Sequence, residues 1–129
     1  MNLLDENVPR DQRELLERWN IKVQQIGIHV GRLGMLDEAI IPLLLRLRRP
    51  TFFTRDAGFY DATLRHAKYG LVFLDVDKYE SASFVRRFLR HPEFNTQAKR
   101  MGMIARLSGT GIWLLKISGR RETHVDWEP

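Results

Sequence analysis

Short strand-like segments alternate with helical patterns along this chain, and few protein architectures accommodate such an alternation. The strand-like segments are residues 3–4, 21–28, 50–54, 71–74, 103–107, 112–117 and 123–127. Strands that alternate with helices are typical of a mostly parallel sheet. Residues 108–111, Ser-Gly-Thr-Gly, indicate a hairpin turn between two of the last strands. We therefore predict an α/β fold with a mostly parallel central sheet and an antiparallel C-terminal hairpin.

Helical spacing of apolar residues predicts five helices. The first follows Pro9, which suits the first helical position because its missing N–H would be unbonded there. In the second, Asp37 is a candidate N-cap, but Pro42 would remove a hydrogen bond from the first turns. Either that first turn is irregular or the regular helix begins near Pro42. The predicted helices are residues 10–20, 36–49, 58–66, 79–91 and 93–101.

Length and composition limit the class of protein. A chain of 129 residues is expected to form one domain, with an α/β core over residues 1–101 and a hairpin and tail over residues 102–129. The absence of cysteine excludes disulfides and thiolate metal sites and favours a reducing compartment. The first residues are acidic rather than apolar, so no secretory signal is expected. We expect a cytoplasmic protein without a membrane partner.

Acidic residues follow several of the predicted strands. Asp5 and Glu6 follow residues 3–4, Asp56 follows residues 50–54, and Asp37 lies at a helix start. In right-handed βαβ units the carboxyl ends of the strands and the amino ends of the returning helices share one edge of the sheet. Carboxylates crowded there repel one another unless a cation neutralises them. Oxygen ligands without His or Cys suit a hard ion, Mg²⁺ or Mn²⁺.

Each acid also has a plainer explanation when it is taken alone. Asp at a helix start is common for capping and dipole reasons, so Asp37 alone indicates a cap rather than a ligand. Asp75 and Asp77 alone indicate solvation of a strand end. The expected placement of Asp5 and Asp56 together favours a functional role for that pair.

Three segments resemble the PIN-like family of small bacterial proteins. They are Leu-Asp-Glu-Asn-Val-Pro at 4–9, Asp-Glu-Ala-Ile at 37–40 and Phe-Thr-Arg-Asp-Ala-Gly-Phe at 53–59. The same motifs occur in that family in this order and at closely similar spacings, and the similarity covers roughly the first half of the chain. The resemblance implies a three-layer α/β/α fold and a metal-dependent ribonuclease, of the kind that acts as the toxin of a toxin–antitoxin pair.

The resemblance also implies roles for individual residues. Asp5 and Asp56 become the central metal ligands, Asp37 a further acidic ligand, and these three the catalytic residues. Glu6 is a fourth ligand, and Asn7 and Thr54 support the two strand ends. The implied cofactor is Mg²⁺ or Mn²⁺, and the implied partners are RNA, an antitoxin protein and a second copy of the chain. Lower-ranked ligand candidates are Glu38, Asp61 and Asp75.

One departure from the family pattern leaves a second function open. Relatives often carry another acid immediately before the Phe, where this chain has Gly58. Asp61, two residues beyond Phe59, is a candidate substitute. Without one, the chain would be an incomplete PIN-like module that binds RNA or a protein and does not cut. A third alternative is a receiver-like phosphoacceptor domain, which would require a lysine after a fifth parallel strand.

Arginines are the candidate contacts to RNA. The net charge of +5 favours a polyanionic partner. Arg86, Arg87 and Arg90 lie on one predicted helix, and Arg55 adjoins Asp56. We predict that these four residues contact RNA, while a solvated helix face explains the helical three equally well.

Overall fold

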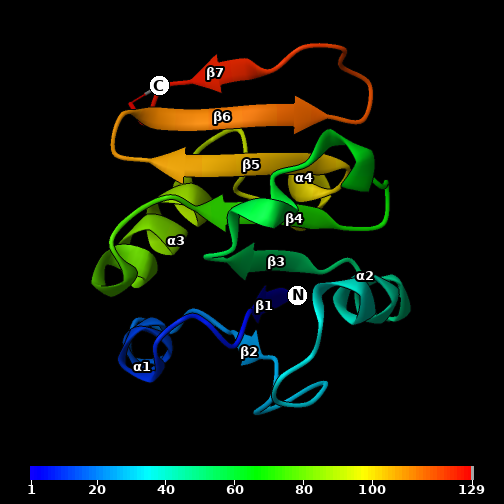
Figure 1. Ribbon diagram of the computed structural model, residues 1–129. Coiled ribbons are helices and arrows are strands. Elements are labelled where there is room, and N and C mark those ends of the chain that lie inside the picture. The colour runs from blue at the N-terminus through cyan, green and yellow to red at the C-terminus, as the bar shows by residue number, and fades with distance from the viewer. Residues whose placement is uncertain (129) are drawn as a thin grey trace.

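Seven strands form one mixed sheet in the computed structural model, which describes residues 1–128 (Figure 1). The strands are β1 (Asn2–Leu4), β2 (Gln24–Gln25), β3 (Thr51–Thr54), β4 (Gly70–Leu74), β5 (Met103–Ser108), β6 (Gly111–Lys116) and β7 (Thr123–Val125). Their order across the sheet is β2-β1-β3-β4-β5-β6-β7. β1 to β5 are parallel, and β6 and β7 are antiparallel to their neighbours. The predicted α/β class, with a mostly parallel sheet and antiparallel C-terminal strands, is confirmed.

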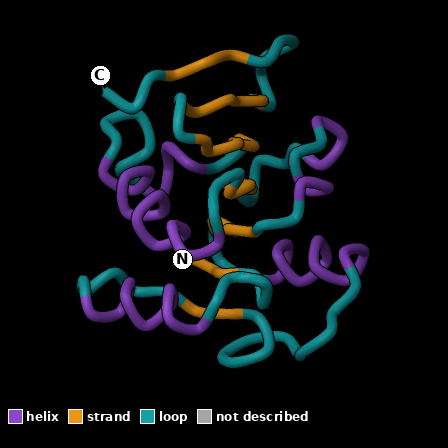
Figure 2. Tube along the Cα trace, turned by 60° about the vertical axis from the view of Figure 1, so that its left-hand side comes forward, coloured by secondary structure: helices purple, strands orange, loops and turns teal. Residues whose placement is uncertain are grey.

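Helices lie on both faces of this sheet. The α-helices are α1 (Arg10–Arg18), α2 (Asp37–Arg46), α3 (Ser81–Arg90) and α4 (Gln97–Arg100), and the 3₁₀ helices are η1 (Ala57–Phe59), η2 (Ala62–Leu64) and η3 (Lys78–Glu80). Figure 2 shows the strands between two sets of helices. Buried residues of α1 and α3 share one apolar core, and those of α2 and η1 share the other.

The central residues of β3 and β4 are apolar because both faces of these strands are buried. Phe52 and Phe53 are adjacent in β3, so their side chains point to opposite faces of the sheet. Both are fully buried, Phe52 in the core beneath α2 and Phe53 in the core beneath α3. Leu3 and Leu4 divide between the two cores in the same way.

The strand order creates a reversal next to β1. From β1 the chain passes through α1 to β2 on one side, and then through α2 to β3 on the other side of β1. In open α/β sheets this reversal leaves a crevice outside the carboxyl ends of the two central strands, where ligands bind. Here those strands are β1 and β3, which Asp5 and Asp56 follow.

Several predicted elements differ from the structure at their ends. β2 has two residues instead of the predicted eight at 21–28, because it pairs only with Leu3 and Leu4 of the short strand β1. Gly27, with φ of 87°, then turns the chain away. The predicted helix over 58–66 is two 3₁₀ turns, each capped by an aspartate, and only α4 forms within 93–101.

The second helix begins earlier than Pro42. α2 starts at Asp37 and continues through Pro42, which lies on its exposed side. Leu36 occupies the N-cap position, so the prediction that Asp37 caps the helix is wrong. Because Asp37 is the first helical residue and makes no capping hydrogen bond, its carboxyl group is available to other partners.

The hairpin also differs from its predicted relation to the core. β5 pairs in parallel with β4, so the first hairpin strand is the fifth parallel strand of the sheet. It ends at Ser108, and no lysine follows it in the turn to β6. Pro129, the last residue of the expected tail, lies outside the described residues. Within residues 1–128, no helix has the length and apolar character that crossing a bilayer requires.

Candidate active site

Asp5 is the first residue after β1 and is 6 % exposed. Its Oδ2 accepts a hydrogen bond from the Thr54 hydroxyl at 2.7 Å. Its Oδ1 accepts one from the backbone N–H of Glu6 at 2.8 Å. Leu3 and Leu4 anchor β1 in the two cores, so the carboxylate that follows them is held rigidly at the edge of the sheet.

Asp56 and Asp37 reach the same edge from other elements. Asp56 lies two residues beyond β3, and its N–H donates to Thr54 Oγ1 at 3.0 Å. Its Oδ1 accepts a hydrogen bond from the Gly58 N–H at 2.8 Å. Asp37 opens α2, and its carboxyl group lies near enough to Asp56 and Asp5 for both to raise its pKa. The structure therefore brings together all three residues that the sequence selects as central acids.

Burial and mutual repulsion disfavour the charged forms of two of these acids. Burial is the largest cause of the raised pKa of Asp5. The hydrogen bond from Thr54 lowers this pKa in part, and the charges of Glu6 and Asp56 raise it further. The pKa of Asp37 is raised by partial loss of solvent, then by its hydrogen bond with Asp56 and by the charges of Asp56 and Asp5. No ion pair within residues 1–128 involves any of the three. The negative charge of the cluster lacks a lysine or arginine partner.

Asp37→Asn is expected to stabilise the protein at pH 7 without divalent ions. The pKa of Asp37 is raised on folding, so the protonated acid suits the folded state, and this stability is lost as pH rises through the folded-state pKa. The neutral amide should therefore raise the free energy of unfolding near neutrality, by less than about 1 kcal/mol because the group is exposed. Urea unfolding at pH 7 and pH 3 checks this, and the gain should vanish at pH 3. Glu93→Gln is the control, and destabilisation by Asp37→Asn at pH 7 would contradict the assignment.

Two supporting residues join the strand ends. Thr54 Oγ1 lies between Asp5 and Asp56, donating to the first and accepting from the second. Asn7 Nδ2 donates to the same oxygen at 3.4 Å, and Asn7 Oδ1 accepts from the Arg55 backbone N–H at 3.1 Å. Thr54 and Asn7 thus connect the loops after β1 and β3.

Gln25 is a supporting residue that sequence reasoning missed. It is 3 % exposed, and its Nε2 donates to the backbone oxygens of Asp5 and Val8 at 3.0 and 2.9 Å. Its Oε1 accepts a hydrogen bond from Arg13. A glutamine in a strand-like segment carries no signal that separates it from a surface glutamine, so only the structure identifies its role behind the site.

The remaining acids have other partners or lie apart. The Glu6 carboxylate accepts hydrogen bonds from the Gly34 N–H at 3.1 Å and so fixes the loop before α2. Asp61 caps η2 through Thr63, which also lowers its pKa. Asp75 pairs with Arg106 at 3.1 Å. Glu38 is exposed on α2 and adds the smallest of the effects that raise the pKa of Asp37.

The arginines of α3 lie apart from the acids. Arg86 stacks over the Trp19 ring at 3.6 Å, and Arg87 lies over the Trp127 ring at 4.4 Å. Arg87 and Arg90 occupy the last turn of α3, which runs from the carboxyl edge of the sheet toward the opposite edge. Arg55 is the one predicted RNA contact next to the cluster, and its Nε is buried without a hydrogen-bond partner among the described residues.

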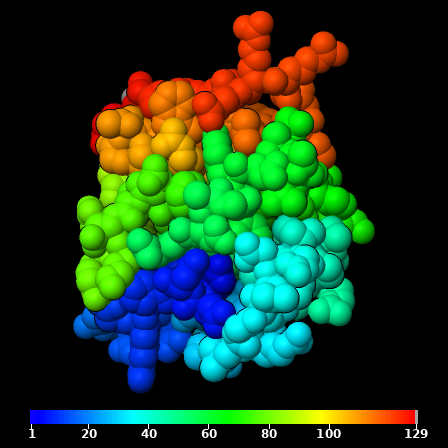
Figure 3. Space-filling model, in the orientation of Figure 1, coloured from blue at the N-terminus to red at the C-terminus, as the bar shows by residue number. Residues whose placement is uncertain are grey.

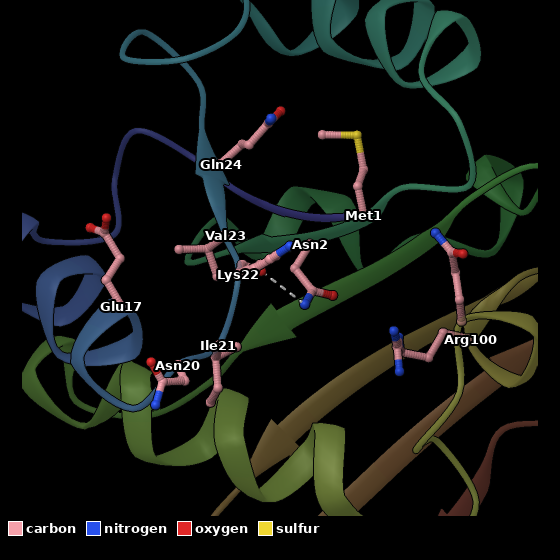
Figure 4. A pocket seen from close by; sticks show the side chains of 10 residues that line it. Met1, Asn2, Glu17, Asn20, Ile21, Lys22, Val23, Gln24 and Arg100 are labelled. Carbon is pink, nitrogen blue, oxygen red and sulfur yellow. Dashed lines mark hydrogen bonds between the residues drawn. The ribbon is translucent and has the colours of Figure 1, made fainter.

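A cavity of about 790 Å³ lies away from the acidic edge. Met1, Asn2, Glu17 and Arg100 are among the residues that line it. Figure 4 shows the Asn2 amide donating to the Lys22 carbonyl beside this cavity. Asn2 begins β1, whereas Asp5 follows its end, so the cavity opens at the other edge of the sheet.

The donor set of the acidic cluster fits a hard divalent ion. Asp5, Asp37 and Asp56 provide only oxygen, the ligand atom that Mg²⁺ and Mn²⁺ prefer. Across residues 1–128, no three Asp, Glu or His side chains are placed closely enough to enclose an ion as they stand. A site that used all three carboxylates would require at least one of them to rotate, and Asp37 is exposed.

Comparisons with protein-family models, with curated proteins and with solved structures found no match for this chain.

Proposed function

We propose that this protein is a Mg²⁺- or Mn²⁺-dependent ribonuclease of the PIN-like type. The observation that carries the proposal is the convergence of Asp5, Asp37 and Asp56 at the reversal between β1 and β3. None of the three is paired with a basic side chain in the described part of the chain, residues 1–128. An uncompensated cluster of carboxylates at this position attracts a divalent cation.

The arrangement of layers supports the PIN-like part of the proposal. Helices on both faces of a mostly parallel sheet agree with the three-layer α/β/α fold that the resemblance implies. The three resembling segments supply Asp5, Asp37 and Asp56, one from each segment. A role as the toxin of a toxin–antitoxin pair is a finer form of the proposal, and it rests on the resemblance alone.

Asp5, Asp37 and Asp56 are the residues that would hold the ion. When bound, Mg²⁺ or Mn²⁺ orients a phosphate group and lowers the pKa of an attacking water. Thr54 keeps Asp5 and Asp56 at a constant separation through its shared hydroxyl. The burial of Asp5 excludes water from one side of the site, which strengthens electrostatic interactions there.

An incomplete module that binds without cutting is the second candidate, and Gly58 favours it. A Cβ at position 58 would lie 3.2 Å from Asp56 Oδ1, so a side chain there would begin in contact with the Asp56 carboxylate. The chain lacks that carboxylate. If the site is incomplete, Gly58→Asp should create metal-dependent cleavage that the unchanged chain lacks. If the unchanged chain already cleaves RNA, the incomplete reading is refuted.

Mn²⁺ is expected to raise the melting temperature, and Asp5→Asn should remove most of that rise. An ion that binds only the folded state, at a concentration about 100 times its Kd, raises the free energy of unfolding by about 2.7 kcal/mol. For a domain of this size, that corresponds to about 10 °C. Differential scanning fluorimetry with and without Mn²⁺ measures the shift. Asp61→Asn is the control because its carboxylate caps η2, and it should keep the full shift.

A crystal soaked in Mn²⁺ tests the site directly. An anomalous peak within bonding distance of Asp5 and Asp56 is the expected result. Absence of both this peak and a Mn²⁺-dependent melting shift would refute the metal-dependent nuclease.

A further inference from the structure

A row of side chains extends the acidic site across one face of the sheet. The strand register places Thr54 of β3 beside Phe73 of β4, and Phe73 beside Arg106 of β5. Arg106 is in turn opposite Trp113 of β6, and Trp113 is opposite His124 of β7. Thr54 also donates to Asp5, so the row starts at the acids.

All members of this row point to the same face. Along β3, β4 and β5, the residues two positions earlier are Phe52, Leu71 and Ile104, and all three belong to the core on the α2 side. Since side chains alternate along a strand, Thr54, Phe73 and Arg106 lie on that side as well. Trp113 is on this side because its neighbours Ile112 and Leu114 belong to the other core.

No helix of residues 1–128 covers this row over β5 and β6, although η1 and η2 lie beside it. Figure 3 shows part of the surface of β5 and β6, in orange, exposed next to the green segment that contains η1 and η2. Arg106, Trp113 and Tyr60 are each half-buried, so one side of each is open to solvent. The loop after β6 adds two exposed cations, Arg120 and Arg121.

Neighbouring groups hold the row in place. The Arg106 guanidinium lies 5.4 Å from the centre of the Trp113 ring and 5.9 Å from that of Tyr60. The Trp113 and His124 rings are 4.5 Å apart, tilted by 60°. Asp75 pairs with Arg106 through Nη1 only, which leaves the other N–H groups of the guanidinium for a phosphate. The Tyr60 hydroxyl donates to Glu122 and so ties the loop after β6 to this face.

We propose that the Arg106, Trp113 and His124 part of this row, with Tyr60 beside Arg106, is the path of single-stranded RNA to the acidic cluster. The inference rests on the proposed function for its direction, since the row leads from β7 to Asp5. Unpaired bases stack on aromatic rings, and a guanidinium among the rings contacts the backbone phosphates. Trp113 lies three strands from Thr54, roughly 14 Å at the usual strand spacing. A single-stranded RNA bound at Trp113 would place one of its next phosphates near Asp5, Asp37 and Asp56.

The arginine stripe predicted on α3 is thereby a competing RNA surface on the other face. It offers matched controls, because Arg86 stacks on Trp19 as Arg106 stacks near Trp113. Both arginines and both tryptophans are half-buried residues. Separate substitution of the Arg106 and Trp113 pair and of the Arg86 and Trp19 pair shows which face of the sheet RNA binds.

The experiment measures binding of a labelled single-stranded RNA of about ten nucleotides by fluorescence anisotropy. EDTA is present, so cleavage does not interfere. Trp113→Ala should weaken binding by about 5- to 150-fold, the range for loss of one stacked base. Arg106→Gln should lower the salt dependence of log Kd by about 0.7, the value for one phosphate contact on a single strand. Trp19→Ala and Arg86→Gln should change neither quantity, and a duplex of the same sequence should bind more weakly.

A second measurement covers the case in which Trp113→Ala does not fold. In the Trp19→Phe, Trp127→Phe protein, Trp113 is the only tryptophan left, and single-stranded RNA should quench its fluorescence. His124→Ala, at an exposed position, should weaken binding in the same direction as Trp113→Ala.

The outcomes separate this inference from the proposed function. If RNA is never cleaved but binding depends on Trp113 and Arg106, the path stands and the nuclease fails. If RNA is cleaved while Trp113→Ala and Arg106→Gln leave Kd and KM unchanged, the path is refuted. Weakening by Arg86→Gln alone would refute it as well, in favour of the α3 surface.

Discussion

Asp56→Asn is expected to reduce Mg²⁺- or Mn²⁺-dependent RNA cleavage by at least about 100-fold while leaving the fold intact. Loss of a residue that hydrogen-bonds to a metal ligand lowers metal affinity or activity by about 10- to 100-fold. Loss of a direct ligand should lower activity at least as much. The amide oxygen can still accept the hydrogen bond that Asp56 Oδ1 receives from the Gly58 N–H. The change therefore removes a charge from the cluster and little else. Initial rates on a fluorescent single-stranded RNA, with circular dichroism for the fold, measure the effect.

Asp77→Asn is the matched control for this experiment. Asp77 also follows a strand, β4, and its Oδ1 accepts a hydrogen bond from a backbone N–H two residues on, that of Tyr79. It lacks the contact with Asp37 that Asp56 makes. Asp77→Asn should keep full activity. Equal activity of the two variants would show that the cleavage comes from elsewhere on the chain or from a contaminant.

Phe88→Ala is expected to lower the free energy of unfolding by about 3–5 kcal/mol. Phe88 of α3 is fully buried, and its ring packs edge-on to Phe53 at 6.0 Å and parallel to Phe94 at 4.7 Å. The truncation leaves a cavity between α3 and the sheet and removes two aromatic contacts. Since domains of this kind are stable by about 5–15 kcal/mol, the variant should be close to unfolding at 37 °C.

Urea unfolding followed by fluorescence measures this loss. Leu45→Ala is the control, because Leu45 is 39 % exposed on α2, and its truncation should cost less than about 1 kcal/mol. A loss below about 1 kcal/mol for Phe88→Ala would mean that α3 does not pack on β3 and β4 as described.

Strand and helix identity followed from local pattern for most of the chain. Apolar residues lie at the centre of both β3 and β4, a charged residue follows each strand, and α3 follows helical spacing. The ends of these elements were therefore predicted to within about two residues. The local pattern failed to predict the ends of elements that depend on contacts with another part of the chain. β2 is short because β1 offers it only two residues, and α2 tolerates Pro42 because that residue faces solvent.

The site divides in the same way. Asp5, Asp37 and Asp56 were selected from sequence because each ends a strand or begins a helix, and such positions share one edge of a parallel sheet. The sequence could not predict that Glu6 accepts a hydrogen bond from the Gly34 N–H, or Asp61 one from the Thr63 N–H. A carboxylate at a strand end or in a turn has the same local sequence pattern whether it binds an ion or a backbone N–H.

The amino-acid sequence by itself determined the α/β class, the order of strands and helices along the chain, and which acids stand at element ends, because these depend on residues close together in the chain. Only the tertiary structure decided which strands are neighbours. That order puts β1 next to β3 and brings Asp5 beside Asp56, and it also aligns Arg106, Trp113 and His124 from three strands into one row. Pairing between distant segments depends on how both faces of the sheet are buried, and no local pattern records it.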